Sequence, residues 1–367
     1  MKFIDFFCGI GTIRMGMEKA GYECVYSVEW DKHKRGIYNV IFGSEPEGKD
    51  IRQVRGFELP RADCWCFGAP CQDFSIAGKR EGLEGDRSSL VREIFRLLRE
   101  VEEEYRPKYL FYENVKGMLS SNKGFDFLEI LSEMASVGYD RIEYSLLNSK
   151  NYGVPHNRER VYTAGHLRGA STRKIFPIGE TTTGNLEQLN NPSHSTNRLY
   201  SSNGIARCLR AEAGGKGAKT GLYLVGNTHP SGKGMNGNVW DSKGFCPALT
   251  TNKGEGMKVL VREATKKGYA EVHEGDSINL AVPGSKTRRG RVGKCVANTL
   301  DTSCNQGTLI KGRIRRLTPK ECWRLQGISD EITDKVRAAG ISDSQMYRGA
   351  GDACTVNVIY EIARRMS

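Results

Sequence analysis

The 367-residue sequence predicts an α/β protein with a doubly wound sheet and a smaller inserted domain of mainly β or irregular structure. Three observations lead to this prediction. Short apolar runs alternate with helix-like segments up to about residue 167, which is typical of a doubly wound sheet. A basic, glycine-rich segment follows, and helix-like patterns return after about residue 313. We therefore expect one domain from residues 1–167 and 313–367, interrupted by a second at 168–312.

The elements of the first domain are predicted from their apolar patterns. Helices are expected at 12–21, 87–105 and 125–138, and the second has one apolar stripe. Gly138 should end the third. Near the C-terminus, Thr318 and Pro319 predict a helix start, Gly327 predicts its end, and 355–366 should form a closing helix that packs back on the first domain. Strands are expected at 2–7, 24–30, 63–68, 108–115, 142–148 and 160–166.

The positive charge is concentrated in the expected second domain. The whole chain has a net charge of +12, and residues 171–312 contain 20 Lys and Arg against 10 Asp and Glu, or +10 of that total. The same segment holds 21 of the 43 glycines. A basic segment in a nearly neutral chain favours a polyanion as partner, with nucleic acid first. A merely solvated basic surface is the ordinary alternative.

The composition also excludes several classes of protein. No run approaches the roughly eighteen apolar residues of a membrane span, so we expect a cytoplasmic protein that does not bind membranes. Eleven cysteines at irregular spacing do not form a disulfide framework. Cys64 and Cys66 are the one close pair, and no second pair or histidine spacing accompanies them, so we expect no metal site.

A cofactor pocket is predicted after the first two strands. Gly9 and Gly11 in "FFCGIG" follow a strand and precede a helix, where backbone can approach a ligand closely. Arg14 stands where the dinucleotide fingerprint needs a third glycine, which disfavours pyrophosphate. Glu29 lies where an acid would accept both ribose hydroxyls, and Trp30 offers an aromatic face for adenine. These features favour a nucleoside-type cofactor without pyrophosphate, such as S-adenosylmethionine.

A second set of residues falls near the ends of later strands. Cys71 in "GAPCQDFS" follows an apolar strand, and a thiolate there could act as a nucleophile. Glu113 ends the fourth strand at the same edge of the sheet, while Arg158 and Arg160 alternate along an extended segment. Taken singly, each has an ordinary alternative: a packed cysteine, a solvated glutamate, a surface arginine pair.

In this order and spacing, "FFCGIG", "GAPCQDFS", "ENV", "RER" and "RLTPKECWRLQG" resemble the motifs of the DNA (cytosine-5)-methyltransferases. The resemblance covers residues 1–167 and 313–367. It implies a class I S-adenosylmethionine-dependent methyltransferase fold, with a Rossmann-like doubly wound sheet and residues 168–312 as the target recognition domain. The implied activity is methyl transfer from S-adenosylmethionine to carbon 5 of a cytosine flipped out of double-stranded DNA.

The resemblance also implies roles for individual residues. Cys71 is the nucleophile that adds to carbon 6, and Glu113 holds N3 and the exocyclic amine. Arg160 lies near the base O2, with Arg158 and Asn114 in support. The loop at 75–89 closes over the site. The implied cofactor-binding residues are Phe7, Gly9, Gly11, Glu29, Trp30, Asp50, Ile51 and Leu90.

The sequence departs from the family pattern in places. Cys8 and Thr12 stand where Ala and Gly are frequent, and His156 stands where Gln commonly introduces the "RER" motif. Asp352 replaces the asparagine of a Gly-Asn pair and is followed by Ala353 and Cys354. Asp for Asn removes an amide donor close to the expected cofactor pocket.

Other readings differ in substrate or class. A tRNA-directed branch shares the fold and motifs, but the large basic insert favours duplex DNA. A catalytically dead DNA-binding protein is disfavoured by the intact Cys71, Glu113 and Arg160. An adenine amino-methyltransferase is disfavoured because no Asp/Asn-Pro-Pro-aromatic motif occurs. We expect a monomer, and a cognate restriction endonuclease that acts on the same site is a further partner that the resemblance allows.

Overall fold

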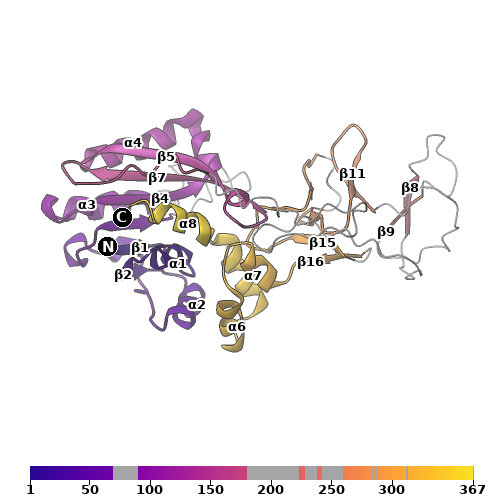
Figure 1. Cartoon of the computed structure of the whole chain (residues 1–367), viewed down its shortest axis with the longest axis horizontal. Coiled ribbons are helices and arrows are strands. Elements are labelled where there is room, and N and C mark those ends of the chain that lie inside the picture. Colours follow the sequence, from indigo (N-terminus) through magenta and orange to yellow (C-terminus); the bar gives the residue numbers. More distant parts are fainter. Residues whose placement is uncertain are drawn as a thin grey trace, which may run out of the picture.

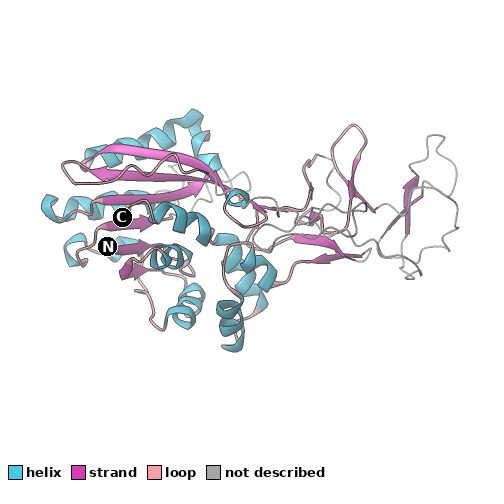
Figure 2. Ribbon diagram, viewed as in Figure 1, coloured by secondary structure: helices cyan, strands magenta, loops and turns pink. Residues whose placement is uncertain are grey.

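The structure, a computed structural model, describes residues 1–68, 90–179, 259–282, 285, 287–310 and 313–366, together with the backbone of 223–227 and 238–241. Its largest element is a six-stranded sheet with the order β2-β1-β3-β4-β7-β5. Helices lie on both faces of this sheet (Figures 1 and 2), so the predicted doubly wound sheet is confirmed. The strands are β1 (Lys2–Phe6), β2 (Glu23–Val28), β3 (Cys64–Phe67), β4 (Tyr109–Val115), β5 (Tyr139–Asn148) and β7 (Glu159–Leu167).

The first four strands are parallel, whereas β7 is antiparallel to both β4 and β5. The short connection from β5 to β7 contains one 3₁₀ turn and β6 (His156–Asn157). A parallel crossover needs a dozen or more residues, so these two strands pair as an extended hairpin. This arrangement places the end of β4 beside the beginning of β7, at the edge of the sheet where the parallel strands end.

Alternating side chains build an apolar core on each face of the sheet. Ile4 and Trp65 belong to the core under α3 (Leu90–Glu100) and α4 (Phe125–Ser136). Phe3 belongs to the opposite core, together with α1 (Thr12–Lys19) and α8 (Val356–Ala363). Cys64 and Cys66 are fully buried in this second core, as the two-residue period of a strand requires. Among the described residues, no cluster of three or more His, Cys, Asp and Glu could hold a metal ion.

The C-terminal helices are α5 (Pro319–Arg324), α6 (Asp330–Ala338), α7 (Asp343–Asp352) and α8. As predicted, α5 begins after Thr318 with Pro319 at its first position, and Glu321 completes a capping box with Thr318. The helix ends at Arg324, before the expected Gly327. α8 packs against α1 so closely that a Cβ on Gly16 would lie 2.5 Å from the Cβ of Ile359. The expected return of the tail to the first part of the chain is therefore confirmed.

Most of the remaining strands form small sheets that extend beyond α7 (Figure 1). β10 (Val259–Arg262) pairs with β11 (Tyr269–Val272), and β8 (Tyr223–Asn227) pairs with β9 (Asn238–Asp241). A four-stranded sheet contains β13 (Val292–Gly293), β12 (Ser277–Asn279), β15 (Gln306–Ile310) and β16 (Arg313–Arg316) in that order. Val261, Val272, Ile278 and Leu309 give this part its own small core.

The expected domain limits differ in detail from the pairing seen here. β16 pairs with β15, so this hairpin crosses the expected boundary between residues 312 and 313. Ile175, Phe176 and Ile178 belong to the core of the six-stranded sheet, although they follow the expected boundary at 167. In addition, β14 (Ala297–Asn298) pairs in parallel with β6. No helix in the described part of the chain is long and apolar enough to cross a membrane.

Candidate active site

One cavity of about 780 Å³ lies where β1, β2, β3 and β4 end, and the end of α7 completes its wall. Such an edge is the usual ligand site of a doubly wound sheet. The cavity brings together most residues that the sequence singled out, but Cys71 and the loop at 75–89 lie outside the described residues and stay predictions. The predicted residues that line it are Phe7, Gly9, Glu29, Trp30, Asp50, Ile51, Leu90, Glu113, Arg158 and Arg160.

The turn after β1 is held open by positive φ angles. Phe7, Gly9 and Gly11 have φ values of 57°, 58° and 86°. A Cβ added to Gly9 would meet nothing within 4 Å, so the backbone there faces open space. The Gly9 N–H donates to one Glu29 oxygen at 2.9 Å, and the Asp31 N–H donates to the other at 2.9 Å. The buried Glu29 carboxylate is thereby fixed between two backbone amides beside the cavity.

Gly11 differs from the prediction, because it does not line the cavity. A Cβ at Gly11 would lie 2.3 Å from the Phe42 ring on α2 (Lys32–Phe42). Its small size is therefore needed for α1 to approach α2, and its positive φ lets the chain enter α1. Arg14 packs against the same helix, with its guanidinium 4.2 Å from the centroid of the Phe42 ring.

Trp30, Ile51 and Leu90 give another part of the cavity lining an apolar and aromatic character. Trp30 is 67% exposed at the rim, which leaves its ring accessible to a ligand. Asp50 caps a short 3₁₀ helix (Ile51–Gln53), and its hydrogen bonds from Arg52 lower the pKa of its carboxyl. Ile51 is buried, and Leu90 at the start of α3 is half-buried. These residues would surround a flat ring with apolar contacts.

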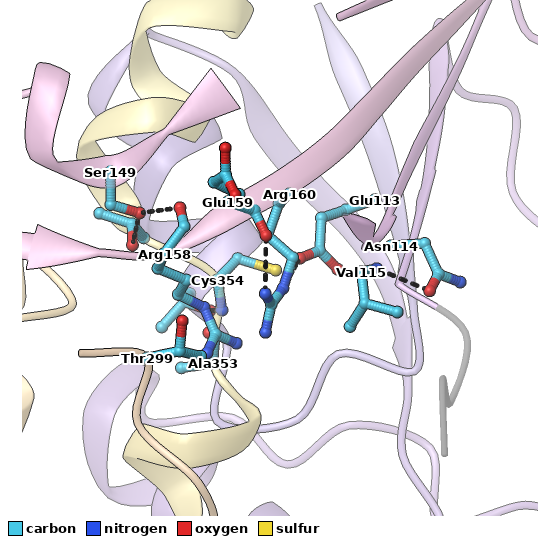
Figure 3. A network of polar contacts seen from close by, with 12 residues as sticks. Glu113, Asn114, Val115, Ser149, Arg158, Glu159, Arg160, Thr299, Ala353 and Cys354 are labelled. Carbon is cyan, nitrogen blue, oxygen red and sulfur yellow. Dashed lines mark hydrogen bonds and ion pairs between the residues drawn. The ribbon is translucent and has the colours of Figure 1, made fainter. Parts of the chain in front are cut away.

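Glu113 and Arg160 form an ion pair at the opposite side, with 3.2 Å between Oε1 and Nε. The antiparallel register pairs Val115 of β4 with Arg160 of β7, so Glu113 and Arg160 are near neighbours across two strands. Figure 3 shows their side chains meeting. Both side chains are largely buried, which strengthens their attraction compared with a pair in water. Asn114 is buried beside them and donates to the Tyr112 hydroxyl.

Arg158 points away from this ion pair and contacts backbone instead. Its guanidinium donates to the carbonyls of Ala353 at 2.9 Å, Gly351 at 3.2 Å and Leu300 at 3.4 Å. Burial and the nearby Arg160 lower the pKa of Arg158 to about 10, so it remains charged at neutral pH. Its position fits a supporting role, in which it joins three segments around the cavity (Figure 3).

Several lining residues carried no role in the sequence reasoning. The Cys354 sulfur lies near Glu113 and Arg160 (Figure 3), and burial together with the Glu113 charge raises the pKa of its thiol. Lys34 of α2 pairs with Asp352 of α7 at 2.8 Å. Asp352 and Cys354 could be suspected from the altered Gly-Asn turn. No pattern pointed to Lys34, which is one of several basic residues at the start of α2.

His156 acts as a bridge behind the cavity. The Leu300 N–H donates to His156 Nε2 at 3.2 Å, which leaves Nδ1 to donate to the Leu325 carbonyl at 3.0 Å. Burial, and secondarily the Arg158 charge, lower the pKa of His156 to about 3. The neutral ring therefore links β6, the loop that contains Leu300, and the end of α5.

Comparison with known proteins places this chain in a family. Residues 1–367 match the family described as C-5 cytosine-specific DNA methylase. The orphan methyltransferase M.SPRI of Bacillus phage SPR is 32% identical over 432 residues, covering 100% of this chain and 97% of that protein. The type II methyltransferase M.HgiCI of Herpetosiphon aurantiacus is also 32% identical, covering 98% of this chain and 96% of that protein.

The solved structure of the Entamoeba histolytica methyltransferase EhMeth matches with a TM-score of 0.55 at 16% identity, covering 100% of this chain and 97% of that one. This likeness supports the fold, and the family match makes the chain an α/β methyltransferase. Within that class, the chain belongs to the C-5 cytosine-specific DNA methylases and is a DNA (cytosine-5)-methyltransferase.

Proposed function

We propose that this enzyme transfers a methyl group from S-adenosylmethionine to carbon 5 of a cytosine flipped out of double-stranded DNA. The observation that carries the proposal is the shared cavity. It joins the Gly9 and Glu29 turn at one end to the Glu113 and Arg160 pair at the other. A cofactor and a base that occupied these two ends would meet inside one enclosure, which is the requirement for direct group transfer.

The residues present fit S-adenosylmethionine and disfavour a dinucleotide. Open space beside the Gly9 backbone leaves room for a ligand, and Glu29 is held where its carboxylate can accept ribose hydroxyls. Trp30, Ile51 and Leu90 provide faces for adenine. Arg14 is turned toward α2, and no third glycine creates a pyrophosphate site. When bound, S-adenosylmethionine supplies an electrophilic methyl group.

In the proposed mechanism, the Cys71 thiolate adds to carbon 6 and makes carbon 5 electron-rich enough to accept the methyl group. Glu113 holds N3 and the exocyclic amine, where charge develops during the addition. Arg160 is paired with Glu113, so both side chains are fixed before the base arrives. Loss of the carbon-5 proton then expels Cys71 as thiolate and restores the aromatic ring.

We further propose that residues 168–312 form the target recognition domain. The described residues of this part and of adjoining β16 expose many basic side chains, and phosphate contacts need such charges. A base inside a duplex cannot reach the cavity, so the target must be flipped out at a cost of a few kcal/mol. The exposed basic residues are Arg262, Lys266, Lys267, Arg288, Arg289, Lys294, Arg313, Arg315 and Arg316.

The experiment that tests this function compares two substrates. Purified enzyme is incubated with labelled S-adenosylmethionine and either genomic duplex DNA or bulk tRNA. We expect label in the DNA alone, and bisulfite sequencing of the DNA should place it on cytosines in one sequence context. Transfer to tRNA, or methylation of adenine, would contradict the proposal.

A further inference from the structure

A partly exposed ion pair forms one wall of the cavity. Lys34 Nζ lies 2.8 Å from Asp352 Oδ2, and both side chains line the cavity. They come from α2 and from the last turn of α7, which are distant in the chain. Burial alone would lower the pKa of Lys34, but the charges of Asp352 and Glu29 outweigh it and raise that pKa. Lys34 therefore presents a full positive charge at the surface of the cavity.

The Lys34–Asp352 pair lines the same cavity as the residues that we expect to surround adenine. Trp30, Asp50 and Ile51 surround the end where we place adenine. Asp352 lies two residues before Cys354, whose sulfur is near Glu113 and Arg160. In S-adenosylmethionine one sulfur carries the methyl group, the ribose carbon and the amino acid chain. The amino acid end must therefore lie within a few bonds of the reacting methyl group, on the side of Asp352.

We propose that Lys34 and Asp352 together bind the amino acid end of S-adenosylmethionine, with Lys34 on its carboxylate and Asp352 on its ammonium. This inference rests on the proposed function, since it assumes that cofactor. The α-amino acid group is a zwitterion, and a lysine beside an aspartate is its charge complement. Asp352 also ends α7, where the helix carbonyls favour a positive group.

The pair also accounts for the departure at position 352. An aspartate in place of asparagine loses an amide donor and adds a negative charge near Glu29. Lys34 restores a donor and neutralises that charge. A second ion pair, from Arg348 to Asp31 at 3.1 Å, joins the same two helices, so α2 and α7 remain connected without Lys34. The Lys34 charge can therefore bind a ligand, because it is not the only contact that holds α2 and α7 together.

Binding calorimetry of the full chain with three probes tests this inference. S-adenosylmethionine carries both charged groups, decarboxylated S-adenosylmethionine keeps only the ammonium, and 5′-methylthioadenosine has neither. Lys34→Met should lower the affinity for S-adenosylmethionine about 10- to 100-fold, the usual effect of losing a charged hydrogen bond. It should leave the affinity for the other two probes unchanged. Asp352→Asn should lower the affinity for both probes that carry the ammonium and leave that for 5′-methylthioadenosine unchanged.

Two further variants serve as controls. Lys34→Arg keeps the charge and should retain most of the affinity. Lys32→Met removes an exposed charge from the same helix and should change nothing. If Lys34→Met loses affinity equally for all three probes, the ion pair has only a structural role and the inference is overturned. Binding of S-adenosylmethionine by the wild type would in that case still support the proposed function. A wild-type chain that binds none of the probes would overturn both.

Discussion

At the scale of single residues, strand register sets the geometry of the proposed active-site pair. Glu113 and Arg160 meet because β4 and β7 are antiparallel neighbours, and no loop has to order for them to pair. The sequence could predict both residues because each lies next to a strand end within a recognisable motif. It could not predict that Arg158 turns to the carbonyls of Leu300, Gly351 and Ala353, because those groups are more than 140 residues away.

The pair predicts a large catalytic effect from a small change. Glu113→Gln keeps the shape of the side chain but removes the negative charge that pairs with Arg160 and that, in the proposed mechanism, stabilises the base. We expect kcat to fall about 100- to 1,000-fold, the usual loss for a preorganised charge in an active site. Steady-state methylation of duplex DNA measures it. Glu159→Gln is the matched control, since Glu159 pairs with Lys116 at the surface, and its rate should stay within about twofold.

His156 predicts a pH dependence of stability. Its folded pKa of about 3 lies below the unfolded value of about 6.5, so the unfolded chain binds more protons between these limits. The stabilisation is complete above pH 6.5 and is lost as pH falls through that window. From pH 7 to 5.5 the wild type should lose about 1 kcal/mol more unfolding free energy than His156→Gln. Urea unfolding at both pH values measures it, and equal losses would contradict the account.

At the scale of elements, sequence patterns predicted the six strands of the large sheet and five helices, α1, α3, α4, α5 and α8. They missed α2, α6 and α7. α2 begins with the charged run "KHKRG", and only Ile37 and Tyr38 are buried on it. Its start depends on Asp31, whose side chain accepts from the N–H groups of His33 and Lys34. Such short polar helices gain stability from caps and tertiary contacts. Because neither produces a periodic apolar pattern, the pattern could not predict these helices.

Alanine substitution is expected to have opposite effects at two helical glycines, one packed against another helix and one facing open space. In α1, Gly16→Ala would place a methyl group 2.5 Å from the Ile359 Cβ, so the helices must separate. We expect a loss of about 1–3 kcal/mol of unfolding free energy. In α2, Gly36→Ala would meet nothing within 4 Å and should add about 0.5–1 kcal/mol through helix propensity. Chemical denaturation measures both, and a neutral Gly16→Ala would contradict the close packing.

At the scale of the whole molecule, the positive charge is concentrated in the part of the chain that we propose binds DNA. The basic excess lies in residues 171–312, outside the six-stranded sheet, and part of it is exposed on the β10–β16 sheets. Composition could predict this surface because charge is additive along a sequence. The strand order of these small sheets was not predictable, since short polar strands carry little periodic signal and pair across long separations.

This charge distribution predicts salt-dependent DNA binding. Lys266→Gln with Lys267→Gln removes two exposed charges next to β11. If both contact phosphates, the slope of log affinity against log salt should become shallower by about 2, with little effect on the sequence context of methylation. Fluorescence anisotropy over a salt series measures the slope. Lys2→Gln removes an exposed charge at the start of β1 and should leave the slope unchanged. An unaltered slope in the double variant would remove these lysines from the DNA interface.

The most direct test of the central claim is covalent trapping on DNA in which every cytosine is replaced by 5-fluorocytosine, so that the target sequence need not be known. Fluorine cannot leave carbon 5 as a proton does, so the Cys71 adduct should persist. We expect a denaturant-resistant protein–DNA complex that needs S-adenosylmethionine and is absent with Cys71→Ala. An enzyme that methylates cytosine but never forms this complex, or forms it equally well without Cys71, would contradict the account.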